Sequence, residues 1–159
     1  MAMIEAAQET DGSSILSVTA ATGVFSPAEL SCVEELWSAY QAKGEASDYN
    51  FLVSREYGQI KGYACFGPRA LTQGTYDLYW IAVDPAAQGR GIGHALLARV
   101  EAEVRARGGR LVIIETSDTR AYAAARQLYA RGGYQREALI RDFYAPGDSL
   151  LIFSKHLDI

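Results

Sequence analysis

A strand–turn–helix segment with three closely spaced glycines constrains the fold of this chain more than any other part. The apolar run 78–83 predicts a buried strand, and the amphipathic pattern that begins near Ile92 predicts a helix. Between them lie Gly89, Gly91 and Gly93. Glycine lets a ligand approach the backbone closely, and a helix N-terminus offers unpaired N–H groups with partial positive charge. The segment therefore predicts an anion site of the kind that holds phosphate.

Two familiar glycine motifs do not fit this turn. A P-loop needs a lysine and a serine or threonine directly after its last glycine, whereas His94 and Ala95 follow Gly93. A dinucleotide fingerprint needs a third glycine where this chain has Leu96. A purely structural tight turn explains one or two glycines but not three. The sequence therefore favours a phosphate-binding turn of another type.

Length and composition are those of one globular domain covering residues 1–159. Hydrophobic residues make up 49% of the 159 residues and charged residues 21%. No apolar run approaches the ~18 residues that span a bilayer, and the N-terminus lacks a basic region followed by an apolar one. We therefore expect a cytoplasmic protein with no membrane partner, a monomer or a homodimer.

Charge and cysteine usage exclude other classes. The formal net charge is −4, and lysine and arginine do not cluster outside helix surfaces, which argues against a nucleic-acid partner. Cys32 and Cys65 form neither a disulfide framework nor a metal-ligand pattern. We expect two reduced thiols and no metal.

Patterning along the chain predicts an α/β fold of the α+β type. It predicts strands at 15–22, 49–55, 59–66, 75–83, 111–116, 134–141 and 149–157, with helices at 26–43, 92–107 and 121–131. The helix expected at 26–43 begins with a capping box, Ser26-Pro27-Ala28-Glu29. The strand–helix–strand unit at 75–116 favours a parallel crossover, whereas the flanking hairpins favour antiparallel pairing. The expected sheet is mixed, mostly antiparallel and seven-stranded, with a central parallel pair and flanking helices.

The glycine turn and a late helix together resemble a known family. Residues 88–93, Gln-Gly-Arg-Gly-Ile-Gly, fit the Q/R-x-x-G-x-G/A signature of the GNAT (GCN5-related) N-acetyltransferases. Residues 128–134, Leu-Tyr-Ala-Arg-Gly-Gly-Tyr, resemble that family's late-helix pattern L-Y-x-x-x-G-F. The element order is similar to the GNAT fold, and the segments 77–85, 115–117 and 142–148 resemble a bacterial subgroup, mostly without assigned substrates.

The resemblance implies acetyl-CoA as donor and an amine, on a small molecule or a protein, as acceptor. The backbone around the glycine turn would hold the pyrophosphate, and the strand before it, which often bulges in the family, would pair with the pantetheine arm. Contacts to the donor are expected from Ile81, Ala82, Val83, Gln88, Gly89, Arg90, Gly91, Ile92, Gly93, His94, Tyr122, Arg126 and Tyr129. His94 has an alternative interpretation as a solvated residue of the first helical turn.

The chemistry requires a base for the acceptor ammonium and a proton donor for the departing thiolate. By resemblance, Tyr129 stands at the position of the acid, although it could simply pack against the sheet. Asp77 stands where some members carry a catalytic glutamate, and its alternative is a solvated strand-end carboxylate. Glu115 is the rival base, because parallel strands end at the same crevice; alternatively it pairs with Arg120 or Arg126.

Aromatic residues and one departure from the family pattern concern the acceptor. Tyr122 occupies the position where many members carry asparagine, seven residues before the tyrosine of the late helix. It shares a helical face with Arg126 and Tyr129. Strand alternation predicts Tyr76 and Trp80 on one face and Asp77 and Tyr79 on the other. The resemblance implies that the segment 142–144 closes the acceptor site.

Two functions of other classes compete with catalysis. A non-catalytic acyl-CoA-binding module would keep the glycine turn and need neither Tyr129 nor Asp77. A nucleotide-binding regulator could use the same anion site. Competition between ATP and CoA separates the second of these from the others.

Overall fold

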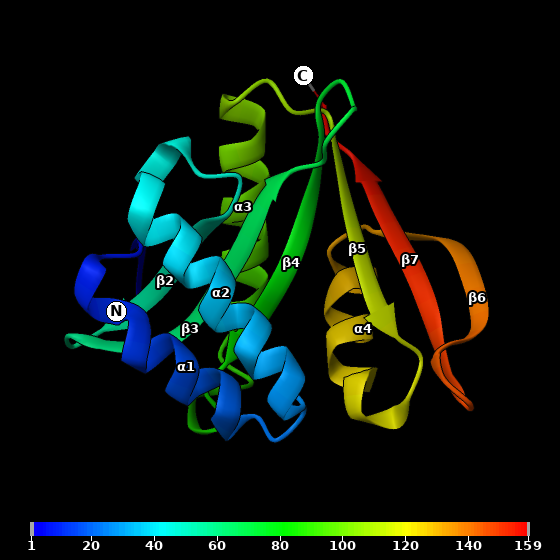
Figure 1. Cartoon of the computed structure of the whole chain (residues 1–159), viewed down its shortest axis with the longest axis horizontal. Helices are drawn as coiled ribbons and strands as arrows, with labels where there is room; N and C mark the ends of the chain where they lie inside the picture. The colour runs from blue at the N-terminus through cyan, green and yellow to red at the C-terminus, as the bar shows by residue number, and fades with distance from the viewer. Residues whose placement is uncertain (1, 159) are drawn as a thin grey trace.

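The computed structural model describes residues 2–158, which form one seven-stranded sheet with four α-helices (Figure 1). The strand order is β1-β2-β3-β4-β5-β7-β6, and every neighbouring pair is antiparallel except β4 and β5. This confirms the predicted mixed sheet. The elements are β1 (Met3–Ala6), α1 (Gly12–Ala21), α2 (Pro27–Lys43), β2 (Asn50–Glu56), β3 (Gln59–Pro68), β4 (Thr75–Val83), α3 (Ile92–Ala106), β5 (Leu111–Ser117), α4 (Ala123–Arg131), β6 (Gln135–Ala145) and β7 (Asp148–His156).

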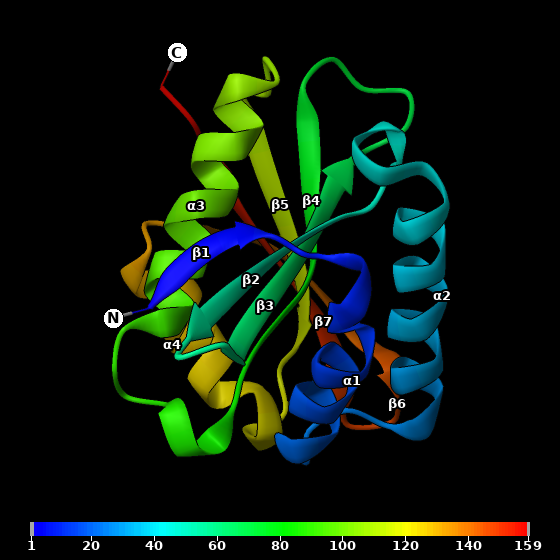
Figure 2. The same cartoon turned by 90° about the vertical axis from the view of Figure 1, so that its left-hand side faces the viewer.

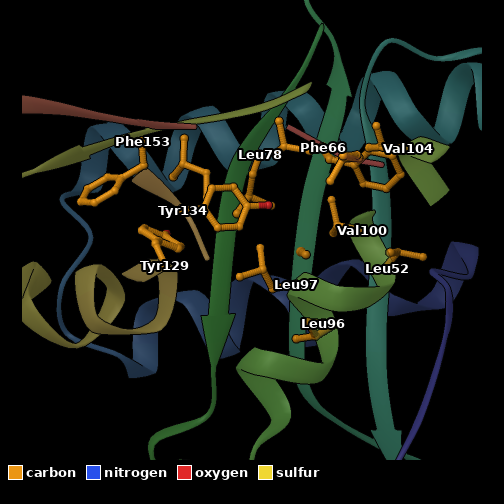
Figure 3. Close-up of a cluster of buried hydrophobic side chains, with 14 of the residues drawn as sticks. Leu52, Phe66, Leu78, Leu96, Leu97, Val100, Val104, Tyr129, Tyr134 and Phe153 are labelled. Atoms are coloured by element: carbon orange, nitrogen blue, oxygen red, sulfur yellow. The ribbon is translucent and has the colours of Figure 1, made fainter. Parts of the chain in front are cut away.

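The sheet separates two hydrophobic cores. Helices α1 and α2 cover one face, and α3 and α4 cover the other (Figure 2). Strand β2 alternates between the cores, with Leu52 on the α3 side and Phe51 and Val53 on the α1 side. Along α3, buried residues recur at helical spacing and meet Leu78 and Tyr129 (Figure 3). No helix within residues 2–158 is long and apolar enough to cross a membrane.

The predicted first strand at 15–22 is wrong. These residues belong to α1, and the sheet instead begins with β1, which is only four residues long. Ile15, Val18 and Thr19 are buried at spacings of three and four, a helical pattern. The Thr19 hydroxyl also donates to the Ile15 carbonyl at 2.7 Å, so a β-branched residue is accommodated inside the helix. Tertiary packing against the sheet outweighs local β propensity here.

The central parallel pair opens part-way along its length. Strand β4 pairs with β5 only from Thr75 to Leu78, opposite residues 111–114. Beyond these positions the two strands diverge (Figure 1). A register shift against β3 also places one extra residue, Tyr79, in β4, because Cys65 faces Trp80 and Phe66 faces Leu78.

This bulge corrects the predicted alternation along β4. Tyr76 packs against the core on the α3 side, whereas Tyr79 and Trp80 both pack against the core on the α1 side. The expectation that Tyr76 and Trp80 share a face is therefore wrong. One additional residue resets the two-residue period, and periodicity alone cannot reveal it.

Candidate functional site

A cleft of about 1520 Å³ occupies the space where β4 and β5 separate. Strand β4, the glycine turn and the start of α3 line one side of it, and β5, α4 and the start of α2 line the other side. The lining residues include most of the predicted set: Asp77, Ile81, Ala82, Val83, Gln88, Gly89, Gly91, Ile92, Gly93, His94, Glu115, Tyr122 and Tyr129.

The glycine turn leaves backbone N–H groups unpaired at the start of α3. Gly89 and Gly91 have φ values of 79° and 82°, in the left-handed region that favours glycine. The Ala95 N–H donates to the Gly91 carbonyl at 3.0 Å, so the N–H groups of residues 92–94 have no partner within the helix. No acidic residue lies in the first turn of α3. The turn therefore suits an anion such as a pyrophosphate.

Gly93 contributes to close packing and does not have a positive φ value. A Cβ at this position would lie 3.3 Å from Leu128 Cδ2 of α4. The absence of a side chain lets α3 and α4 approach each other where both line the cleft. Gln88 supports the same turn, because its side-chain amide donates to the Val83 carbonyl at 3.2 Å.

The last residues of β4 present a free strand edge to the cleft. On one side β4 remains paired with β3 as far as Val83, opposite Gly62. On the other side, β5 has diverged after Leu78. The backbone of residues 81–83 therefore has unpaired polar groups on the cleft side, and an extended amide-containing chain can pair with them as an added strand.

Tyr129 combines a buried ring with a hydroxyl that reaches the cleft. Its side chain is 6% exposed and packs against Tyr134 and Phe153, with ring centroids 6.4 and 5.9 Å away. Among residues 2–158 the Tyr129 hydroxyl has no hydrogen-bond partner, and Tyr129 lines the cleft. Burial raises the pKa of this phenol, so it stays protonated and can donate.

The two predicted base candidates share one arginine. Arg69 Nη2 donates to Asp77 Oδ1 at 2.7 Å and lies 3.6 Å from Glu115 Oε1. Asp77 is buried, whereas Arg69 and Glu115 are both 44% exposed. Asp77 is thus an ion-paired carboxylate rather than a solvated one, and the partner of Glu115 is Arg69 rather than Arg120 or Arg126.

Two predicted donor-binding residues lie outside the lining of the cleft. Arg90 pairs with Glu56 of β2, and Arg126 donates to the carbonyls of Ser117 and Thr119 at 3.0 and 2.6 Å. Arg126 therefore fixes the loop between β5 and α4. Their contacts to a donor stay predictions.

Tyr122 lines the cleft and faces α2. Its hydroxyl donates to Glu29 Oε2 at 3.1 Å. Burial, together with the Glu29 carboxylate, raises the pKa of Tyr122. The same Glu29 completes the predicted capping box, because its Oε1 accepts the Ser26 N–H at 3.1 Å.

The part of the cleft lined by Phe25, Glu29, Arg69, Glu115 and Tyr122 lies away from the glycine turn, and we call it the acceptor end. The sequence analysis missed several of its residues. Arg69, Glu29 and Phe25 line the cleft, but they come from segments distant in sequence from the glycine turn. Of the segment 142–144, which was expected to close the acceptor site, Tyr144 is among the lining residues of the cleft, and its closing role stays a prediction. No local motif marks these residues, since they meet through the sheet topology alone.

Fold and site together define a class. A parallel strand pair that opens beside a helix N-terminus, with a free strand edge, is suited to a protein that binds an extended ligand ending in a phosphate group. Comparisons place the chain more narrowly. The family model described as "Acetyltransferase (GNAT) domain" matches residues 47–136, so the chain belongs to the GNAT acetyltransferase family.

Individual relatives agree with this assignment. A GNAT-family acetyltransferase structure from Desulfovibrio desulfuricans is 40% identical and has a TM-score of 0.94, covering 98% of this chain and 99% of that one. The N-alpha-acetyltransferase RimI of Mycobacterium tuberculosis is 40% identical over 101 residues, which are 62% of this chain and 61% of that protein. This chain thus matches about three fifths of that curated relative.

A further structure has the same fold at lower identity. It is an acetyltransferase from Salmonella typhimurium solved with its cofactor acetyl-CoA. The TM-score is 0.77 at 24% identity, and the alignment covers 99% of this chain and 94% of that one. It shows that the fold is shared over nearly the whole chain.

Proposed function

We propose that this protein is an acetyl-CoA-dependent N-acetyltransferase that acts on an amine. The observation that carries the proposal is the meeting of three features in one cleft: the free edge of residues 81–83, the unpaired N–H groups at the start of α3, and the Tyr129 hydroxyl. Family membership supports it, as does the donor bound in a structure of the same fold.

The residues present fit the chemical groups of this donor. The N–H groups of residues 92–94 belong to the first turn of α3, which contains no carboxylate, so they suit a pyrophosphate. His94 and Arg131 add side-chain N–H donors to the lining of the cleft. The open edge of residues 81–83 suits the amides of a pantetheine arm. When bound, acetyl-CoA supplies a thioester, an acetyl group activated for transfer to an amine.

The chain's own groups move two protons. Glu115 accepts the proton of the acceptor ammonium, because its carboxylate is half exposed and lies 3.6 Å from Arg69, whereas Asp77 is engaged at 2.7 Å. The neutral amine nitrogen then forms a bond to the acetyl carbon as the carbon–sulfur bond breaks. Tyr129 donates its hydroxyl proton to the departing sulfur, and general acid catalysis of this kind contributes about 10²–10⁴-fold. The acylated nitrogen loses its second proton to solvent, and solvent returns a proton to the Tyr129 oxygen, so that the amide, the thiol and the tyrosine all end neutral.

Ligand-induced stabilisation tests the binding step. A ligand at 100 times its Kd adds ~2.7 kcal/mol to stability, which for a chain of this size raises Tm by about 5–10 °C. We expect that rise with acetyl-CoA and CoA, and none with NAD or ATP. A flat response to CoA would contradict the proposal, and a response to ATP alone would favour a nucleotide-binding regulator.

Tyr129→Phe separates an enzyme from a binding module. Turnover of acetyl-CoA should fall by about 100-fold or more, while CoA binding changes only a few-fold. Tyr134→Phe is the matched control, because Tyr134 lies in the same core but donates to Glu101, away from the cleft. Equal activity in the two variants would remove the acid role of Tyr129, and absence of turnover in the unmodified protein would favour a non-catalytic acyl-CoA-binding module.

The same proposal covers the domain organisation, the location and the oligomeric state of the protein. We propose a single acetyltransferase domain that works in the cytoplasm as a monomer or homodimer, without a metal. Light scattering of the purified protein gives the oligomeric state directly.

A further inference from the structure

The acceptor end of the cleft is markedly acidic. Four carboxylate side chains line the cleft at or near this end: Glu29, Asp77, Glu115 and Asp148. Among the described lining residues, the only cation at this end is Arg69, and it is already paired with Asp77 and Glu115. The other basic residues of the lining lie elsewhere: His94 is in the first turn of α3, beside the glycine turn, and Arg131 is the last residue of α4. A net negative charge therefore faces whatever occupies the acceptor end.

Aromatic rings accompany these carboxylates. Tyr122 donates to Glu29, and Phe25 meets the Tyr122 ring edge-on with centroids 6.4 Å apart. Burial raises the pKa of Tyr144, and the negative charges of the nearby Glu115, Asp148 and Glu29 raise it further. Rings beside carboxylates bind ammonium groups through cation–π and ionic attraction.

The carboxylates form two groups along the cleft: an inner group, Asp77 and Glu115, at the point where β4 and β5 diverge, and an outer group, Glu29 and Asp148, beyond it. Glu115 and Ser117 lie on the same face of β5, two residues and therefore ~7 Å apart. Ser117 Oγ donates to Asp148 Oδ1 at 2.5 Å, which places Asp148 at the outer position. Arg126 of α4 donates to the carbonyls of Ser117 and Thr119 and is not among the residues that line the cleft.

A second, independent feature marks where a ligand reacts. The Tyr129 side chain is more than nine-tenths buried, lines the same cleft, and has a hydroxyl without a partner among residues 2–158. The acidic lining and this hydroxyl occupy one continuous cavity. An amine held at the inner carboxylates therefore stands within the cavity that the Tyr129 hydroxyl lines.

We infer that the acceptor is a small aliphatic dication, a diamine or polyamine, with one amino group at Glu115 and a second ammonium between Glu29 and Asp148. The inference rests on the proposed acetyl transfer and names the acceptor of that reaction. The first amino group loses one proton to Glu115, forms the bond to the acetyl carbon as the carbon–sulfur bond breaks, and then loses its second proton to solvent. The sulfur of CoA takes the proton of Tyr129, which solvent restores. The second ammonium remains charged throughout.

The geometry disfavours two other acceptors. An acceptor with its own carboxylate would bring a fifth negative charge to a site whose one arginine is already paired. The Tyr122–Glu29 hydrogen bond ties the start of α2, on one face of the sheet, to the residues before α4, on the other. This hydrogen bond joins two side chains that line the cleft on opposite sides, and a bridged opening of this kind favours a thin aliphatic chain over a folded protein surface.

A panel of amines tests the inference by release of free CoA from acetyl-CoA. We expect kcat/KM for 1,4-diaminobutane or 1,5-diaminopentane to exceed that for 1-aminobutane by about tenfold or more, as two partly exposed ion pairs provide. 4-Aminobutanoate should react more slowly than 1-aminobutane. Equal rates for diamine and monoamine, or faster reaction of 4-aminobutanoate or of a peptide N-terminus, would overturn the inference.

Charge-removing variants locate the second ammonium. Glu29→Gln keeps the capping box, since glutamine serves equally at that position, but it removes one of the two outer charges. The diamine-to-monoamine ratio of kcat/KM should fall by about fivefold. Glu34→Gln, an exposed position on the same helix outside the cleft, should leave that ratio unchanged. An unchanged ratio in Glu29→Gln would overturn the placement.

Failure of the inference differs from failure of the proposed function. Stabilisation by acetyl-CoA without turnover of either diamine would overturn the inference alone. The absence of any stabilisation by acetyl-CoA would contradict the proposed function itself.

Discussion

Arg69 Nη2 lies 2.7 Å from Asp77 Oδ1, so a half-exposed arginine neutralises a buried carboxylate at the floor of the cleft. The arginine follows the end of β3, and the aspartate lies near the start of β4, on the neighbouring strand. Arg69 also approaches Glu115, so one guanidinium holds side chains from two strands at the point where those strands diverge. We therefore expect loss of either Arg69 or Asp77 to lower the free energy of unfolding and to change the charge of the cleft.

A double-mutant cycle measures this coupling. Arg69→Ala leaves the Asp77 carboxylate buried without its partner, and Asp77→Asn removes the charge that Arg69 neutralises. Because Arg69 is 44% exposed, we expect a coupling of only about 1 kcal/mol in the free energy of unfolding. Urea unfolding of the two single variants and the double variant gives the value. Additive effects would mean that the ion pair contributes nothing.

The glycine turn gives a prediction with an internal control. Gly91 and Gly108 precede and follow α3, with φ values of 82° and 80°, and a Cβ at either position would meet nothing within 4 Å. Glutamate at either position therefore carries a similar backbone strain, of about 1–3 kcal/mol. Only Gly91→Glu adds bulk and negative charge at the expected pyrophosphate site.

Isothermal titration with CoA separates the two effects. Gly91→Glu should weaken CoA binding by about 100-fold or more, whereas Gly108→Glu should bind CoA as the unmodified protein does. Both variants should lose a similar amount of stability. Equal CoA affinity in the two variants would show that the phosphate site lies elsewhere.

Local sequence signals predicted the parts of the site that depend on local geometry. The glycine turn, β4, α3 and β5 lie where the pattern of glycines and apolar runs predicts, and the capping box at Ser26 is confirmed by reciprocal hydrogen bonds. These features depend on residues a few positions apart. Backbone dihedral preferences and side-chain periodicity are therefore enough to specify them.

The missed features depend on contacts between distant segments. Residues 15–22 satisfy strand propensity and helical spacing equally, and packing against the sheet decides for α1. The extra residue at Tyr79 leaves no trace in composition, yet it turns Trp80 to the opposite core. Glu29 and Tyr122 are 93 residues apart in sequence and meet only because α2 and α4 flank the same opening.

Buried tyrosines predict a loss of stability at high pH. Burial raises the pKa of Tyr63 and of Tyr129 far above the ~10 of an unfolded chain. Tyr79, which is half buried, has its pKa raised to about 12. Above pH ~10 the unfolded chain therefore releases these protons while the folded chain keeps them. The resulting stabilisation of the neutral forms is complete below pH ~10 and is lost as pH rises further.

Comparison of variants isolates the contribution of Tyr129 to the pH dependence of the free energy of unfolding. The free energy of unfolding should fall by about 1.4 kcal/mol per pH unit above pH ~10 for each fully buried tyrosine. Tyr129→Phe should reduce the slope by that amount, whereas Tyr57→Phe, at a position 89% exposed, should leave it unchanged. Urea unfolding at several pH values between 8 and 11.5 measures both slopes. An identical slope in Tyr129→Phe and the unmodified protein would mean that the Tyr129 hydroxyl ionises as freely in the folded chain as in the unfolded one, which would contradict its burial beside the cleft.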